Sequence, residues 1–189
     1  MKYKFHTSLA VLVLFILSGT GRIHAQMIRC ASIKERIVDD SVLAKKTFID
    51  LNNGTRVYGK KLKQPFFKNI TSIDGKEFNN SEIRGYSYDG HYYLFFSGKE
   101  FLRLVEGNVS VYKMTEMSSG RSICNIYAKK GTDGVLTVIR FPKELQEFVK
   151  DCEPAYAMVN LPYSELKDLI KDDPMYLNKV FETYNNSCK

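Results

Sequence analysis

The chain has 189 residues, 28 Lys or Arg against 21 Asp or Glu, a formal net charge of +7, and no tryptophan. It contains no long repeat and no low-complexity tract. Only three histidines occur, and His6 and His24 precede residue 26. A zinc site built on two or three histidines is therefore excluded for the rest of the chain.

Residues 1–25 have the three-part layout of a cleavable secretory signal. Lys2 and Lys4 are basic, the apolar run 9–17 follows, and Ala25 offers a small residue at the cleavage point. The run is about half the length of a membrane span. We expect a secreted or periplasmic protein with no transmembrane span after cleavage. Losing the three basic residues of this leader lowers the net charge to +4, which predicts no nucleic-acid partner.

Turn dipeptides dominate the next hundred residues. Asn-Gly and Asp-Gly suit tight hairpins, and the stretches beside them are rich in Tyr, Phe, Val and Ile. The sequence predicts an antiparallel β-meander of eight to ten short strands between residues 47 and 141, barrel-like or a sandwich, with 92–96 a central strand. The dipeptides are Asn53-Gly54, Asp74-Gly75, Asp89-Gly90, Gly107-Asn108 and Asp133-Gly134.

The periodicity changes after residue 141. Apolar residues then recur at helical spacing, which predicts two or three amphipathic helices within 142–189. Pro154 is expected to end the first, Ser164 to cap a second, and Asp173 to cap a third with a proline at its first position. We therefore expect an α+β fold: a flexible lead segment, 26–46, and a single globular domain, 47–189, with 47–141 β-rich and 142–189 helical.

No catalytic constellation is visible. After the leader the one histidine is His91, at an expected hairpin tip, where a structurally neutral residue is the simplest interpretation. The stretch 85–89 resembles a nucleophile elbow but has Asp89 where that motif needs glycine. No phosphate loop or calcium loop occurs. We expect no catalytic residue, no metal site and no cofactor.

Carboxylates and aromatic rings leave other possibilities open. Two acids suffice for glycoside hydrolysis, although those of the β-region are expected to face solvent: Glu77, Glu82, Glu100, Glu106 and Glu116. The aromatic cluster could line an apolar cavity or stack on sugars, but a sheet core is the favoured interpretation. Its members are Tyr86, Tyr88, Tyr92, Tyr93, Phe95, Phe96 and Phe101.

The order of several short motifs resembles a loose group of exported Bacteroidota proteins of uncharacterised function. The resemblance covers nearly all of the chain after the leader. It implies a periplasmic or surface location, supplies no catalytic residues, and implies that the last two cysteines belong together. The motifs are Asn53-Gly54-Thr55-x-Val57-x-Gly59, Ile83-x-Gly85-Tyr86, Glu106-Gly107-x-Val109-x-Val111-Tyr112, Val149-Lys150-Asp151-Cys152 and Tyr184-Asn185-Asn186-Ser187-Cys188.

Four cysteines in an exported chain predict disulfides, with three possible connectivities. We favour Cys152–Cys188, because Cys152 ends the first expected helix and Cys188 follows the last, so the bond would enclose short helices that are marginal alone. Cys30 and Cys124 would then pair, although a strand cysteine can also stay reduced.

These observations give three functional hypotheses. The first is a non-enzymatic envelope or secreted module that binds or assembles with an envelope protein or a glycan. The second is a carrier of small apolar ligands in an aromatic-lined barrel, which requires a closed cavity. The third is a carboxylate-dependent glycan hydrolase, which requires two carboxylates in one cleft.

Overall fold

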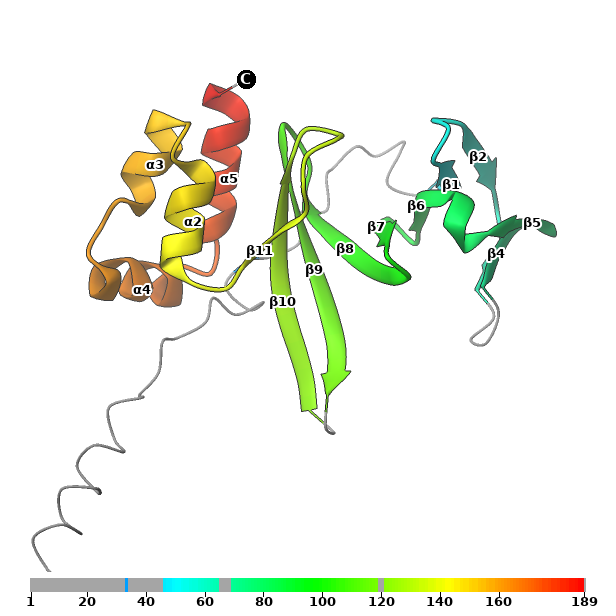
Figure 1. Ribbon diagram of the computed structural model, residues 1–189, viewed down its shortest axis with the longest axis horizontal. Helices are drawn as coiled ribbons and strands as arrows, with labels where there is room; N and C mark the ends of the chain where they lie inside the picture. The colour runs from blue at the N-terminus through cyan, green and yellow to red at the C-terminus, as the bar shows by residue number, and fades with distance from the viewer. Residues whose placement is uncertain (1–32, 34–45, 65–68, 119–120, 189) are drawn as a thin grey trace, which may run out of the picture.

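The protein is an α+β structure in which an antiparallel meander precedes a group of helices, as expected (Figure 1). The computed structural model describes residues 33, 46–64, 69–118 and 121–188. The predicted leader, Cys30 and nearly all of the predicted lead segment lie outside the described residues. None of the described helices is long and apolar enough to cross a membrane.

Eight strands form the large sheet, in the order β11-β10-β9-β8-β7-β6-β1-β2, with every neighbouring pair antiparallel. A second, three-stranded sheet has the order β3-β4-β5, and we call it the small-sheet lobe. The strands are β1 (Thr47–Leu51), β2 (Arg56–Gly59), β3 (Leu62–Lys63), β4 (Ile70–Ile73), β5 (Lys76–Asn79), β6 (Ile83–Tyr88), β7 (His91–Phe96), β8 (Lys99–Val105), β9 (Val109–Ser118), β10 (Arg121–Lys130) and β11 (Thr137–Ile139).

All five turn dipeptides lie between paired strands. Asp74 and Asp89 have φ of 49° and 52°, each followed by a glycine with positive φ, which is the backbone that tight hairpins require. The turn at Ser97 between β7 and β8 was not among the expected ones, although it has the same left-handed pair of residues. Eleven strands in the described residues exceed the eight to ten expected, because the two-residue strand β3 has no turn dipeptide of its own.

The barrel-like alternative is wrong, because the large sheet is open. Its two edge strands are β11 and β2, at opposite ends of the strand order. The hairpin β1–β2 adds onto β6 and so extends the sheet away from β11. At the other end, β11 has only three residues and packs against the first C-terminal helix.

Four helices, rather than two or three, follow the strands. They are α2 (Pro142–Val149), α3 (Glu153–Val159), α4 (Tyr163–Asp172) and α5 (Tyr176–Ser187). Pro154 does not end a helix but lies in the first turn of α3, where the missing N–H costs nothing. The predicted caps Ser164 and Asp173 are also wrong: the N-cap residue is Pro162 in α4 and Met175 in α5. We call these helices, with the face of β8–β11 that they cover, the helical lobe.

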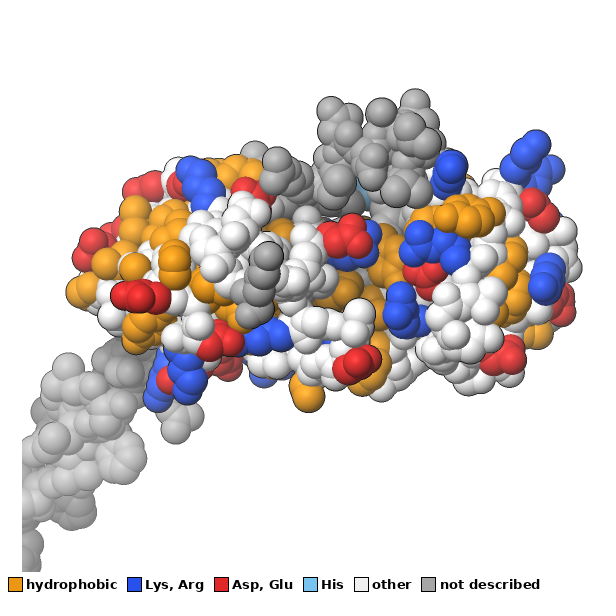
Figure 2. Space-filling model, turned by 90° about the horizontal axis from the view of Figure 1, so that it is seen from above, with side chains coloured by type: hydrophobic (Ala, Val, Ile, Leu, Met, Phe, Trp, Pro, Cys, Tyr) orange, Lys and Arg blue, Asp and Glu red, His pale blue; other side chains and the backbone are white. Residues whose placement is uncertain are grey.

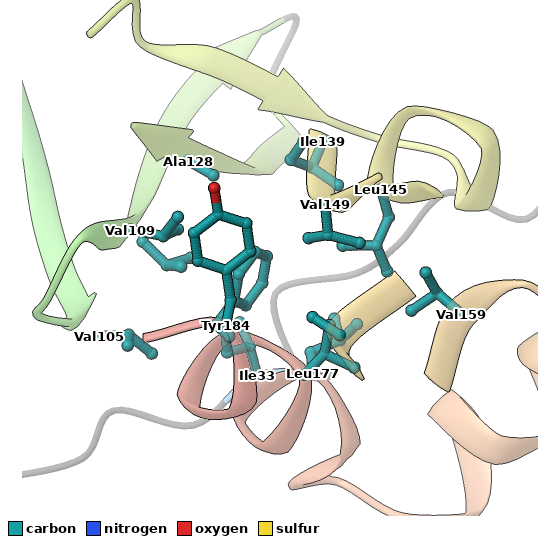
Figure 3. Packing of buried hydrophobic residues seen from close by; sticks show 14 of the residues in the cluster. Ile33, Val105, Val109, Ala128, Ile139, Leu145, Val149, Val159, Leu177 and Tyr184 are labelled. Carbon is teal, nitrogen blue, oxygen red and sulfur yellow. The ribbon is translucent and has the colours of Figure 1, made fainter. Parts of the chain in front are cut away.

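The main core lies between the helices and that face of the sheet. In Figure 3, Val105, Val109 and Ala128 from the strands meet Leu145 and Leu177 from the helices. Burial at this interface is nearly complete, since Val109, Ala128 and Leu145 are 0% exposed. Ile33, within the predicted lead segment, is also buried in this core. A smaller core joins the small-sheet lobe to β1, β6 and β7; it consists of Ile49, Ile73, Phe78, Ile83 and Tyr86.

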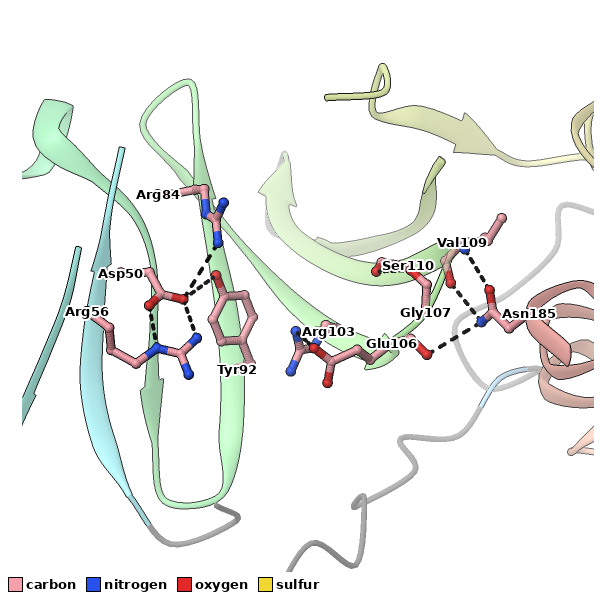
Figure 4. Close-up of polar contacts among 10 residues, drawn as sticks. All are labelled: Asp50, Arg56, Arg84, Tyr92, Arg103, Glu106, Gly107, Val109, Ser110 and Asn185. Atoms are coloured by element: carbon pink, nitrogen blue, oxygen red, sulfur yellow. Dashed lines mark hydrogen bonds and ion pairs between the residues drawn. The ribbon is translucent and has the colours of Figure 1, made fainter. Parts of the chain in front are cut away.

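The end of α5 is fixed to the turn between β8 and β9 by one side chain. Val109 N–H donates to Asn185 Oδ1 over 2.6 Å, and Asn185 Nδ2 donates to the Val109 carbonyl over 2.9 Å (Figure 4). Next to it, the favoured Cys152–Cys188 disulfide is present, with 5.7 Å between the Cα atoms. The Cys30–Cys124 pairing stays a prediction, because Cys30 lies outside the described residues.

Candidate functional site

A groove of about 850 Å³ crosses the large sheet beside the small-sheet lobe. We call it the central groove. Strands β7, β8 and β9 form its floor, and the small-sheet lobe supplies one wall. Its lining residues are Gln64, Asn69, Ile70, Asn80, Tyr93, Phe95, Gly98, Lys99, Glu100, Leu102, Lys113, Met114, Thr115 and Glu116.

Two cross-strand rows make the floor. The first row runs Tyr93–Leu102–Lys113 across β7, β8 and β9, and Phe95 pairs with Glu100 in the second. Tyr93 and Phe95 pack against the smaller core, whereas Leu102 packs against the core of the helical lobe. The floor therefore joins the two cores. Its side chains come from strands that are paired on both sides, so it exposes side-chain chemistry rather than a free backbone edge.

Polar groups surround this floor. Gln64 Nε2 donates to Glu100 Oε1 over 2.8 Å, and Lys99 pairs with Glu116. Burial, and then the charge of nearby Glu100, raises the pKa of Tyr86 above its ordinary value, so this tyrosine stays protonated beside the groove. Amide and charged groups around half-buried rings are the composition of a site that recognises a polar ligand.

Lys113 is the most informative residue of the groove. It lies in β9 between Leu102 and the buried Ile126, and it is half-buried. It makes no ion pair or hydrogen bond with any of the described residues. An ammonium without a partner among the described residues is available to an anionic group of a ligand.

The aromatic cluster divides between core and surface. Tyr86 and Phe101 are buried, as the core interpretation requires. Tyr93 and Phe95 are half-buried in the groove, while Phe96 is 54% exposed on the other face of β7. The cluster therefore serves both as a core and as a surface for a ligand.

His91 lies at the start of β7 and makes a T-shaped ring contact with Tyr93, at 6.5 Å between centroids. Among the other predicted candidates, Glu82 caps the turn at Asn79 and Glu106 pairs with Arg103. Only Glu100 and Glu116 line the groove. No cluster of metal-ligating side chains occurs among the residues that the structure describes.

The opposite face of the sheet holds a charged cluster around Asp50 (Figure 4). Asp50 is 5% exposed and accepts two hydrogen bonds from Arg56, over 2.6 and 2.9 Å. Tyr92 donates to it over 3.3 Å, and Arg84 lies 4.0 Å away. Burial, and then the charge of Asp50, raises the pKa of Tyr92 to about 12. Because its oxygens are already shared among these donors, we assign Asp50 a role in stabilising the β1–β2 hairpin.

A second hollow lies beside α2. It has a volume of about 730 Å³ and includes Val135, Phe141 and Phe148 with charged groups at its border. Val135 is 81% exposed, and three of the charged groups are already held within the protein: Lys130 by Asp151, Glu144 by the Arg140 N–H and Glu147 by Lys150. On the face seen in Figure 2, basic and acidic side chains are interspersed rather than gathered into one patch. Long-range attraction from that face is therefore weak, and local contacts must select a partner.

Three residues of the groove were not expected from the sequence: Gln64, Asn80 and Lys113. One signal was present for Lys113: it follows Val109 and Val111 at the same parity of a strand, where a further apolar residue would be expected.

Comparison with known protein families, curated proteins and solved structures found no match. The resemblance to exported Bacteroidota proteins therefore stays a prediction.

Proposed function

We propose that this protein is an exported, non-enzymatic binding module of the periplasm or cell surface, and that it holds an envelope component in the central groove. The observation that carries the proposal is the groove itself, with aromatic rings in its floor and amides and charges at its border. The leader-like residues 1–25 support export. The Cys152–Cys188 disulfide agrees with an oxidising compartment.

The structure bears differently on the two other hypotheses, the carrier of apolar ligands and the glycan hydrolase. An open sheet has no enclosed interior, so nothing supports the barrel-type carrier. A glycan hydrolase stays the second candidate because Glu100 and Glu116 both line the groove. Release of shorter fragments from an oligosaccharide, abolished by Glu100→Gln or Glu116→Gln, would favour the hydrolase over the binding module.

Adjacent phenylalanines provide a matched test. Phe95 lies in the groove and Phe96 on the other face of the same strand. A photo-reactive azido analogue of phenylalanine is introduced at one position or the other, and cells of the native host are irradiated. We expect a covalent adduct with an envelope component from position 95 and none from position 96. Absence of an adduct at position 95, or equal adducts at both positions, would contradict the proposal.

A further inference from the structure

Two aromatic side chains of the groove follow one another on the same face of β7. Tyr93 and Phe95 are two residues apart on one face of β7, so their Cα atoms are about 7 Å apart. An aromatic ring has a negative face that attracts the polarised C–H groups of a sugar. One face of the Tyr93 ring is stacked on Tyr86, with 5.0 Å between the ring centroids, so a sugar at this position would lie against the rest of the Tyr93 ring, beside another sugar of the same chain on Phe95.

The border of the groove offers hydrogen bonds suited to hydroxyl groups. Glu100 is an acceptor held by Gln64, and the Thr71 hydroxyl donates to Asn80 Oδ1 over 2.8 Å. That bond orients the Asn80 amide, whose N–H groups donate to none of the described residues. The groove therefore offers an acceptor at Glu100 and a donor at Asn80 to the hydroxyl groups of a sugar.

Lys113 favours a ligand that carries a negative charge. The other lysine of the groove, Lys99, is already paired with Glu116. Lys113, by contrast, has no partner among the described residues, and it extends the row that begins at Tyr93. A sugar lying on the rings would bring a ring substituent towards Lys113, and a carboxylate there would form a charge-assisted hydrogen bond.

We propose that the central groove binds an acidic oligosaccharide, with sugar rings on Tyr93 and Phe95, hydroxyl groups on Glu100 and Asn80, and a carboxylate on Lys113. This inference rests on the proposed function and names its ligand class. A peptide fits less well, because an extended peptide adds to a free strand edge and the floor strands are paired on both sides. A helical peptide needs a continuous apolar groove, whereas this one contains four charged side chains.

The test is calorimetric titration of the whole mature protein with tetragalacturonate and with the neutral tetragalactose of the same linkage. Wild-type protein is expected to bind the acidic chain more tightly. Lys113→Gln should weaken that binding about tenfold, the loss of one charge-assisted hydrogen bond, and remove the preference over the neutral chain. Lys129→Gln is the control, because Lys129 is another half-buried lysine on β10 outside the groove.

A second pair of variants separates binding from folding. Phe95→Ala should weaken both oligosaccharides and Phe96→Ala neither, with circular dichroism and urea unfolding showing that each variant folds. No binding of the acidic chain, equal binding of the neutral chain, or an unchanged Lys113→Gln variant would overturn the inference. Tighter binding of a polyglutamate peptide would assign the groove to acidic peptides instead. A photo-adduct at position 95 without oligosaccharide binding would retain the proposed function and reject the sugar.

Discussion

The helical lobe and the small-sheet lobe stabilise the two ends of one sheet in different ways. Nineteen buried residues form the core of the first, and five form the core of the second, among the residues that the structure describes. The helical lobe is also closed by a disulfide. From this difference we expect the wall of the central groove to be less stable than the end that rests on the helical lobe.

Truncating a buried phenylalanine should lower the free energy of unfolding more in the helical lobe than in the small-sheet lobe. Phe181 is 0% exposed in the helical lobe, and Phe181→Ala should lower the free energy of unfolding by about 3–5 kcal/mol. Phe78 is 8% exposed in the small-sheet lobe, and Phe78→Ala should cost at least about 1 kcal/mol less, since a smaller core near solvent collapses more easily. Urea unfolding measures both, and equal losses would contradict the comparison.

The disulfide should account for the next largest effect. Cys152 and Cys188 are 36 positions apart, and removing a bond that closes such a loop costs about 2–4 kcal/mol. The double variant Cys152→Ser, Cys188→Ser should therefore lose its helical lobe first on heating. Hydrogen exchange should rise in α3 and α5 more than in β4. Uniform loss of protection across the chain would show that the lobes do not differ in this way.

The Asn185 side chain should be needed to hold α5 against the sheet, although α5 can form without it. Asn185→Ala leaves the Val109 N–H and carbonyl without their partner, at a cost of about 1–3 kcal/mol. Asn186 is exposed on the same helix, so Asn186→Ala should change stability by less than about 0.5 kcal/mol. Equal values for the two variants in urea unfolding would mean that Asn185 does not fix the helix to the sheet.

The smallest expected effect is a loss of folding stability at low pH, caused by one carboxylate of the small-sheet lobe. Asp74 accepts from the backbone N–H groups of Lys60 and Lys61, over 2.9 Å each, and these bonds lower its pKa. Its contribution is fully present above the unfolded pKa of about 4 and is lost as the pH falls through the lowered folded value. Below pH 4, wild-type stability should therefore fall more steeply than that of Asp74→Asn.

The control is Asp133→Asn, because Asp133 is exposed and makes no contact of this kind with the described residues. Its stability should follow the wild-type pH dependence between pH 7 and pH 2. Parallel curves for wild type and Asp74→Asn would show that this carboxylate has the same pKa in the folded and unfolded chain.

Local chemistry explains which parts of the fold could be predicted. Asp74-Gly75 and Asp89-Gly90 encode hairpins in two residues, whatever the rest of the chain does. In contrast, Pro154 supports either a helix end or a helix start, and only packing against α5 decides between them. Pairing of β1 with β6 joins distant segments, which no local pattern specifies.

The candidate site was even less accessible to prediction. Gln64 and Glu100 are 36 positions apart, and only the packing of the small-sheet lobe beside β7 brings them together. Phe95 and Phe96 look alike in sequence, yet only the register with β8 decides which of them faces the groove. Sequence therefore identified the aromatic strand and named Glu100 and Glu116, but it did not identify Gln64, Asn80 and Lys113 as polar groups of the same surface.

The most direct test of the account is a nuclear magnetic resonance titration of isotopically labelled protein with tetragalacturonate. We expect chemical-shift changes confined to the central groove, with the largest at the backbone amides of Phe95 and Lys113 and near Asn80. The amides of α2 and β11, beside the apolar hollow, should not shift. Changes concentrated at α2, or spread evenly over the protein, would contradict the assignment of the central groove as the binding site.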